Sequence, residues 1–192
     1  MVAQAQDPNK SDFCVVGIDQ ALRNVGFCCN KNGELAAFAV RELKTRGAER
    51  LDCLRRRILM CVDLYSPQLI ALEGYSFNST NRSFDLGEIG GVLKQAFYER
   101  KIHVIAVPPK LLKKFVSNDG NASKEKMIRE VGVRYKFSTE DDNIADAVGL
   151  AKFCEVYVTG RSQYRCELDS VQILREMSEP KEKKKFKSVP SL

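Results

Sequence analysis

The chain has 192 residues, 44% of them hydrophobic and 29% charged, which is typical of one soluble globular domain and excludes a disordered or fibrous chain. No window approaches the roughly 20 consecutive apolar residues of a membrane span, and we expect no signal peptide at the N-terminus. A single histidine, His103, and seven cysteines without a C-x-x-C pair argue against a multi-histidine site, structural zinc or a disulfide framework. We therefore expect an intracellular, cytoplasmic protein.

The net charge of +6 is unevenly distributed. Residues 94–136 carry 11 basic and 4 acidic side chains, whereas residues 137–180 carry 4 basic and 9 acidic ones. A basic block beside an acidic block suggests a surface for a polyanion next to a site where carboxylates gather. The last twelve residues include KEKKKFK, and we interpret 179–192 as a disordered basic tail. Three roles remain open for it: a localisation signal, a tether to DNA and a solubilising tail.

The predicted elements form one α/β domain over residues 13–178, preceded by a flexible segment at 1–12. Apolar runs between turn residues predict five short strands, and Asn32-Gly33 predicts a hairpin turn between the second and third. The strands are expected at 13–19, 25–29, 35–40, 68–73 and 103–107. Helical spacing of apolar residues predicts helices at 48–65, 84–101, 110–116, 124–133, 141–158 and 163–177, and Ser123 is the expected N-cap of the fourth.

Acidic residues stand at positions where the surrounding pattern is apolar. Asp19 and Glu73 each end an apolar strand, and Asp146 lies in a helix among Ala, Val and Leu. Asp142 and Asn143 precede Asp146 by four and three residues, so all three project from about the same helix face. Clustered carboxylates repel one another unless hard cations neutralise them, and an all-oxygen site suits Mg²⁺ or Mn²⁺. Two such ions can hydrolyse a phosphodiester.

Ordinary structural roles are open to some of these acids individually. An acid at a strand end, such as Asp19, is commonly a turn former or a helix cap. Asp141 and Asp142 can cap the helix that follows them, because acids favour a helix N-terminus. The metal-site hypothesis therefore rests on the joint pattern.

That joint pattern resembles the RuvC family of Holliday-junction resolvases in the RNase H-like superfamily, in the form seen in phage-type members. Four segments, spread between residues 13 and 155, carry the resemblance: VVGID ending at Asp19, IALE ending at Glu73, KKFVSNDGNASK from Lys113 to Lys124, and DDNIADA around Asp146. It implies a five-stranded mixed β-sheet flanked by α-helices. It also implies catalytic roles for Asp19, Glu73, Asp142, Asp146, Lys113 and Lys124.

The resemblance further implies a Mg²⁺-dependent endonuclease, with two ions per site and Mn²⁺ as a substitute, that resolves four-way DNA junctions by paired symmetric nicks. Such an enzyme acts in recombination and repair, and in the host cytoplasm if phage-encoded. Paired nicks imply a homodimer, and we expect its interface on helix 84–101, around Leu93, Ala96 and Phe97.

Two departures from the family pattern stand out. The family continues its first Asp with Pro-Gly-Ser, but this chain has Gln20-Ala-Leu. The penultimate family acid corresponds to Asn143, and Asp142 stands one position earlier. Either residue can complete the metal site, and we favour Asp142 for its charge.

We expect DNA contacts from two regions. Lys114 and Lys126 accompany Lys113 and Lys124 in the basic block, where they can bind the phosphate backbone. The segment after Glu73 carries Tyr75, Phe77 and Arg82. Phe77, or else Tyr75, can stack on opened bases; alternatively both rings pack beneath their loop.

Three rival functions follow from the same residues. The first is an RNase H-like nuclease for flaps, forks or RNA–DNA hybrids. The second is an actin-like ATPase or sugar kinase, whose phosphate strand also begins Gly-Ile-Asp, but this chain has no Asp-x-Gly-Gly-Gly loop. The third is an inactive junction-binding module, against which the retained acids argue.

Overall fold

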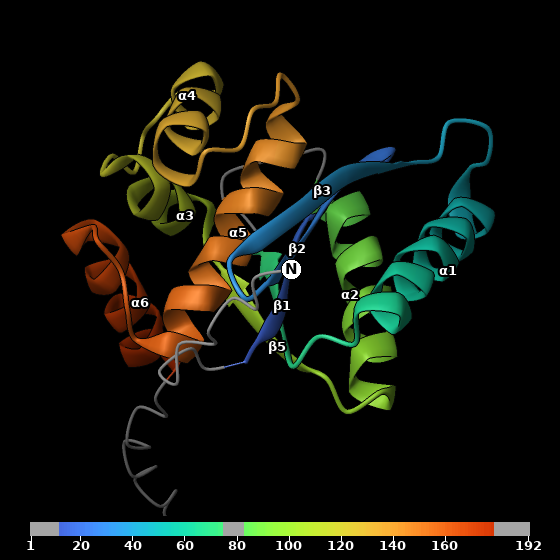
Figure 1. Cartoon of the computed structure of the whole chain (residues 1–192). Coiled ribbons are helices and arrows are strands. Elements are labelled where there is room, and N and C mark those ends of the chain that lie inside the picture. Colours follow the sequence, from blue (N-terminus) through green and yellow to red (C-terminus); the bar gives the residue numbers. More distant parts are fainter. Residues whose placement is uncertain (1–11, 75–82, 179–192) are drawn as a thin grey trace, which may run out of the picture.

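A computed structural model describes residues 12–74 and 83–178, and it contains the predicted five-stranded mixed sheet (Figure 1). The strands are β1 (Cys14–Asp19), β2 (Asn24–Lys31), β3 (Glu34–Arg41), β4 (Leu69–Glu73) and β5 (His103–Val107). They lie in the order β3-β2-β1-β4-β5, with β1, β4 and β5 parallel and β2 antiparallel to both neighbours. Asn32 and Gly33 both have positive φ angles, as the predicted hairpin turn requires.

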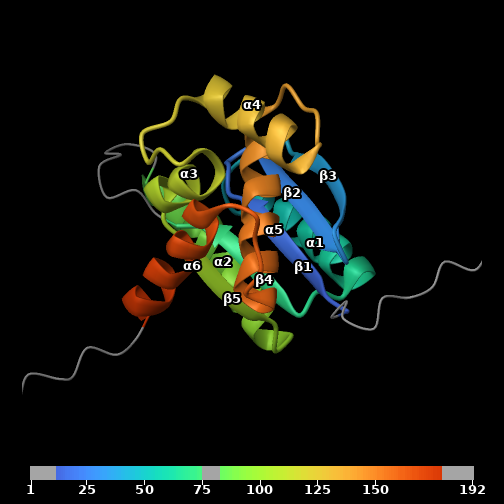
Figure 2. The same cartoon turned by 60° about the vertical axis from the view of Figure 1, so that its left-hand side comes forward.

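In the described ranges, six helices cover the sheet. They are α1 (Gly47–Tyr65), α2 (Ser83–Glu99), α3 (Pro109–Ser117), α4 (Lys124–Tyr135), α5 (Asp142–Thr159) and α6 (Arg165–Ser178). Helices α1 and α2 lie on one face, and α5 crosses the other face with α3, α4 and α6 around it (Figures 1 and 2). None of the helices in the described ranges is both long and apolar enough to cross a membrane.

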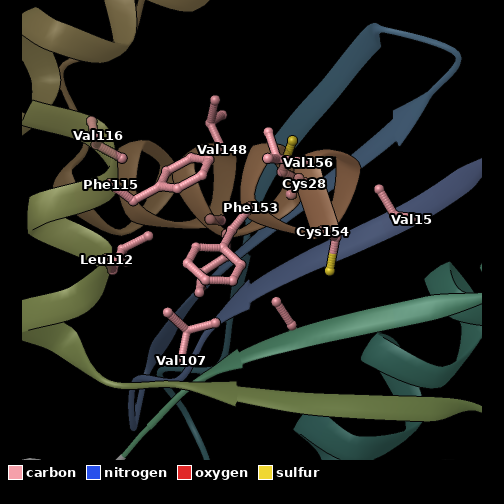
Figure 3. Close-up of a cluster of buried hydrophobic side chains, with 14 of the residues drawn as sticks. Val15, Cys28, Val107, Leu112, Phe115, Val116, Val148, Phe153, Cys154 and Val156 are labelled. Atoms are coloured by element: carbon pink, nitrogen blue, oxygen red, sulfur yellow. The ribbon is translucent and has the colours of Figure 1, made fainter. Parts of the chain in front are cut away.

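The alternation of side chains along each strand divides the core into two layers. Val16 and Ile18 of β1 pack on the α1–α2 side, whereas Val15 packs on the α5 side. In the α5 layer the rings of Phe115 and Phe153 lie 4.8 Å apart between α3 and α5 (Figure 3). Because side chains alternate with a period of two, every second residue of β1 counted from Val15 faces α5, and the last of these is Asp19.

Two glycines let α5 approach the sheet at backbone distance. A Cβ atom on Gly17 of β1 would lie 2.2 Å from the carbonyl oxygen of Ala147 and 2.3 Å from the amide nitrogen of Ala151. A Cβ atom on Gly26 of β2 would lie 2.0 Å from the carbonyl oxygen of Asn143. Only glycine permits this approach, so these two positions fix the height of α5 above the sheet.

The expectation that Leu93, Ala96 and Phe97 form a dimer face is wrong. All three side chains are buried inside the protomer, in the core layer that α1 and α2 form against the sheet. Their helical spacing reflects packing on the sheet and not an outer surface. Among the residues of α1 and α2 whose side chains are described, the exposed large apolar ones are Met60, Leu64 and Tyr98.

We predict that Gly17→Ala lowers the free energy of unfolding by at least about 2–3 kcal/mol, because the new methyl group meets helix backbone that must shift as a unit. Urea unfolding followed by circular dichroism measures the change. Gly91→Ala is the matched control, since nothing lies within 4 Å of the added Cβ and alanine favours a helix by about 0.5–1 kcal/mol. Equal effects of the two substitutions would contradict the close approach.

Candidate active site

Two carboxylates meet at the carboxyl end of the sheet. Asp19 ends β1 and Glu73 ends the neighbouring parallel strand β4, and both lie on the face covered by α5. The Asp19 side chain is almost fully buried, and its carboxyl group shares a hydrogen bond with that of Glu73. The register of two parallel strands thus brings together acids that are 54 positions apart in the sequence.

Helix α5 brings two more acids to the same place. Asp142 opens the helix, and Asp146 follows one turn later on the same side. The negative charges of both residues act on Asp19, and that of Glu73 acts on Asp146. Asp141 has the capping role considered for it, because its carboxylate accepts hydrogen bonds from the amides of Asn143 and Ile144.

The pKa values of Asp19, Glu73 and Asp146 show that this arrangement disfavours their ionised forms. Burial raises the pKa of Asp146 to about 7, and the charges of Glu73 and Asp142 add to the rise. Burial also raises the pKa of Asp19 well above its usual range, with repulsion from Glu73 as the next cause. Burial raises the pKa of Glu73 as well, although its hydrogen bond with Asp19 and the charge of Lys113 offset part of the effect.

Lysines from α3 and α4 surround the acids. The charge of Lys113 acts on both Glu73 and Asp146. Lys124, at the start of α4, forms an ion pair with Asp142, although its side chain is 75% exposed. Lys126 instead pairs with Asp119 at 2.9 Å, across the turn between α3 and α4, and Lys114 stands beside Lys113 on α3. The structure therefore brings Lys113 and Lys124 to the acids.

Gln20 belongs to this group, and sequence reasoning noted it only as a departure from the family pattern. Its side-chain Nε2 donates to the backbone carbonyl of Glu73 at 2.7 Å, which ties the end of β1 to the end of β4. Its Oε1 atom is buried and has no hydrogen-bond partner among the described residues. The signal in the sequence was a polar residue directly after the acid that ends the strand. The structure shows that this position is only 6% exposed, where an apolar residue would be the ordinary choice.

The donor set suits a hard divalent ion. In the described part of the chain, no three His, Cys, Asp or Glu side chains form a ready-made metal site. The groups that converge here offer oxygen donors only: the carboxylates of Asp19, Glu73, Asp142 and Asp146. Oxygen donors with surplus negative charge fit Mg²⁺ or Mn²⁺ and do not select zinc or copper.

Asn143 lies between Asp142 and Asp146 in the first turn of α5, with its backbone against Gly26. Three other predicted DNA-binding residues, Tyr75, Phe77 and Arg82, lie outside the described residues.

Comparisons with known proteins identify relatives of this chain. The family model described as crossover junction endodeoxyribonuclease RuvC matches residues 15–154, a range that includes all four acids, Lys113 and Lys124. A curated protein of that name from Christiangramia forsetii is 27% identical over 162 residues, covering 80% of this chain and 84% of the relative. One from Hydrogenovibrio crunogenus is 24% identical over 152 residues, covering 76% and 88%.

Solved structures share the fold. Thermus thermophilus RuvC superposes with a TM-score of 0.64 at 22% identity, covering 77% of this chain and 96% of that one. The same protein in complex with a Holliday junction substrate gives a TM-score of 0.65 with the same coverage.

We predict that Asp146→Asn stabilises the protein in metal-free buffer, and more at pH 8 than at pH 5. The carboxyl group titrates near 7 in the folded chain and near 3.8 when unfolded, so the folded state binds more protons between these values. Stability from the protonated group is therefore complete below about pH 4 and is lost as the pH rises through 7. The substitution removes a penalty on the order of 4 kcal/mol at pH 8.

Urea unfolding with EDTA at both pH values measures the effect. Asp63→Asn is the control, because that carboxylate is exposed and pairs with Arg100. An equal gain for Asp146→Asn at both pH values would show that burial of the charge is not its cause.

Proposed function

This chain belongs to the RuvC family of crossover junction endodeoxyribonucleases, metal-dependent nucleases of branched DNA, and we propose that Asp19, Glu73, Asp142 and Asp146 form its catalytic centre. The activity is structure-selective cleavage of DNA that resolves four-way junctions. The observation that carries the site assignment is the convergence of four acids, from two strand ends and one helix, at a point where burial raises the pKa values of Asp19, Glu73 and Asp146.

We propose Mg²⁺ as the physiological ion, two ions per site, and Mn²⁺ as an effective substitute. Bound ions of this kind activate water and stabilise the leaving oxygen of a phosphodiester. The chain's part is to hold the ligands on rigid elements: Asp19 and Glu73 on adjacent strands, and the helix acids on α5. Between the two candidates for the fourth ligand, coupling of Asp142 to both Asp19 and Asp146 supports Asp142 over Asn143.

The lysines complete the proposed centre on the substrate side. Lys113 lies where its charge reaches Glu73 and Asp146, so it can neutralise a phosphate held at those acids. Lys124 pairs with Asp142 through a largely exposed side chain, and we propose that it exchanges this carboxylate for a DNA phosphate when substrate arrives. Lys114 and Lys126 extend the basic surface along the DNA backbone.

The segment after Glu73 is proposed to contact the opened centre of the junction. Phe77, or else Tyr75, would stack on unpaired bases, and Arg82 would bind phosphate. Glu73 ends β4 immediately before this segment, so the segment starts at the catalytic centre.

We propose that two copies act together, because paired symmetric nicks need two active sites on one junction. Met60, Leu64 and Tyr98, the large apolar side chains exposed in the described part of α1 and α2, are the candidate contact surface. Asp63 of α1 pairs with Arg100 just beyond α2 at 3.0 Å, so the two helices present one continuous face.

We predict that Asp146→Asn lowers cleavage of a synthetic mobile four-way junction by at least about a hundredfold in Mg²⁺, because it removes a metal ligand. Junction binding, followed by gel shift, should stay within a few fold of wild type, since the DNA-contacting lysines are intact. Asp169→Asn, which removes a half-exposed carboxylate on α6 that pairs with Arg165, serves as the control and should cleave normally. Cleavage by Asp146→Asn at the wild-type rate would refute the assignment. Flaps, forks and RNA–DNA hybrids cleaved faster than the junction would favour the rival nuclease.

We predict that the double substitution Met60→Glu with Leu64→Glu converts the dimer to a monomer, because charged side chains are costly in an apolar interface. Sedimentation velocity measures the change. Met177→Glu is the matched control: Met177 is also exposed, but it lies on α6, on the opposite side of the molecule (Figure 1). A dimer that survives the double substitution would place the interface elsewhere.

A further inference from the structure

The N-terminus of α5 is held to the sheet by side chains that are not among the proposed metal ligands. Asn24 opens β2 and Arg41 ends β3, and the two residues face each other in the last pair of the β2–β3 ladder. Their side chains are joined, since Arg41 Nε donates to Asn24 Oδ1 at 3.0 Å. Both then reach Asp141, the N-cap of α5: Asn24 Nδ2 donates to Asp141 Oδ2 at 3.1 Å, and Arg41 Nη2 lies 3.5 Å from the same oxygen.

The two carboxylate oxygens of Asp141 have separate tasks. Oδ1 accepts the first free amides of the helix, those of Asn143 at 3.0 Å and Ile144 at 3.3 Å. Oδ2 accepts a hydrogen bond from Asn24 and forms an ion pair with Arg41. Asp141 therefore links the sheet to the helix end through one rigid group, and it is not free to bind a metal.

The position of this link matters because of what surrounds it. Asp142 follows Asp141 directly, and Asp146 lies one turn further along the helix. Both are repelled by the strand-end acids, so the electrostatic force at this end of α5 pushes the helix away from the sheet. The link opposes that force at the point of contact, two residues along β2 from Gly26.

We propose that Asn24 and Arg41 are positioning residues for the metal centre, acting through Asp141 to hold Asp142 and Asp146 at the distance from Asp19 and Glu73 that a divalent ion requires. This inference rests on the proposed function. Neither residue touches substrate or metal in this account. Groups that orient metal ligands from behind commonly change metal affinity by about 10–100-fold when they are removed.

Strand β2 offers a matched control for Asn24. Asn30, six residues along the same strand and on the same face, donates its Nδ2 to Glu155 Oε2 of α5 at 2.6 Å. Both asparagines thus bind a carboxylate of the same helix, one at the metal end and one 13 residues beyond Asp142, roughly 20 Å away along the axis. Loss of either contact removes one tie between β2 and α5, but only Asn24 lies at the acids.

The test is Mn²⁺ binding to the full chain by isothermal titration calorimetry, which needs no catalysis. Asn24→Ala should weaken binding about tenfold, whereas Asn30→Ala should change it less than twofold, even if it lowers the melting temperature as much. Arg41→Met should weaken binding and Arg41→Lys should restore most of it, because Arg41 is largely exposed and neither change disturbs the core. In cleavage assays, the Asn24 variant should lower kcat at saturating junction and leave KM nearly unchanged.

Wild-type Mn²⁺ affinity in both Asn24→Ala and Arg41→Met, with folding intact, would overturn the positioning role. Equal losses in Asn24→Ala and Asn30→Ala would also overturn it, since they would reflect general destabilisation. These outcomes leave the proposed function standing if the wild-type chain cuts junctions. A wild-type chain that binds Mn²⁺ and cuts no junction refutes the proposed function instead.

Discussion

The rest of the structure depends on the backbone contact between α5 and the strands beneath it. Gly17 and Gly26 bring the helix so close that a single methyl group at either position would overlap main-chain atoms. That distance decides where Asp142 and Asp146 stand relative to the strand-end acids. The two glycines contribute no functional group to the site. They determine its geometry, because they set the distance between α5 and the strands.

Close packing also makes the site electrostatically costly. Four carboxylates are held close together, and the raised pKa values of Asp19, Glu73 and Asp146 show that the folded chain by itself does not favour their full ionisation. Lys113 and Lys124 offset part of the negative charge, and the Asp19–Glu73 hydrogen bond relieves another part. Negative charge that these groups do not offset is the reason to assign divalent ions here. Bound cations would favour the ionised carboxylates and hold the N-terminal end of α5 to the sheet.

The sequence predicted the fold and the acids because local patterns encode both. Apolar runs between turn residues located β1 to β5, Asn32-Gly33 identified the hairpin, and Asp146 stood out against apolar neighbours. Contacts between distant segments were missed: Gln20, directly after β1, reaches Glu73 at the end of the neighbouring strand β4, and Asn24 and Arg41 reach Asp141 from 100 or more positions earlier in the chain. The assignment of Leu93, Ala96 and Phe97 to a dimer face failed because helical periodicity marks a packed face without telling which partner packs on it.

The central claim is that this chain is a metal-dependent junction resolvase. The most direct measurement is cleavage of a synthetic mobile four-way junction by the wild-type protein in Mg²⁺, in Mn²⁺ and in EDTA, with each strand labelled in turn. The account predicts paired nicks at symmetric positions on two opposing strands with either ion, and none in EDTA. Cleavage that persists in EDTA, or nicks on single strands without a symmetric partner, would contradict it.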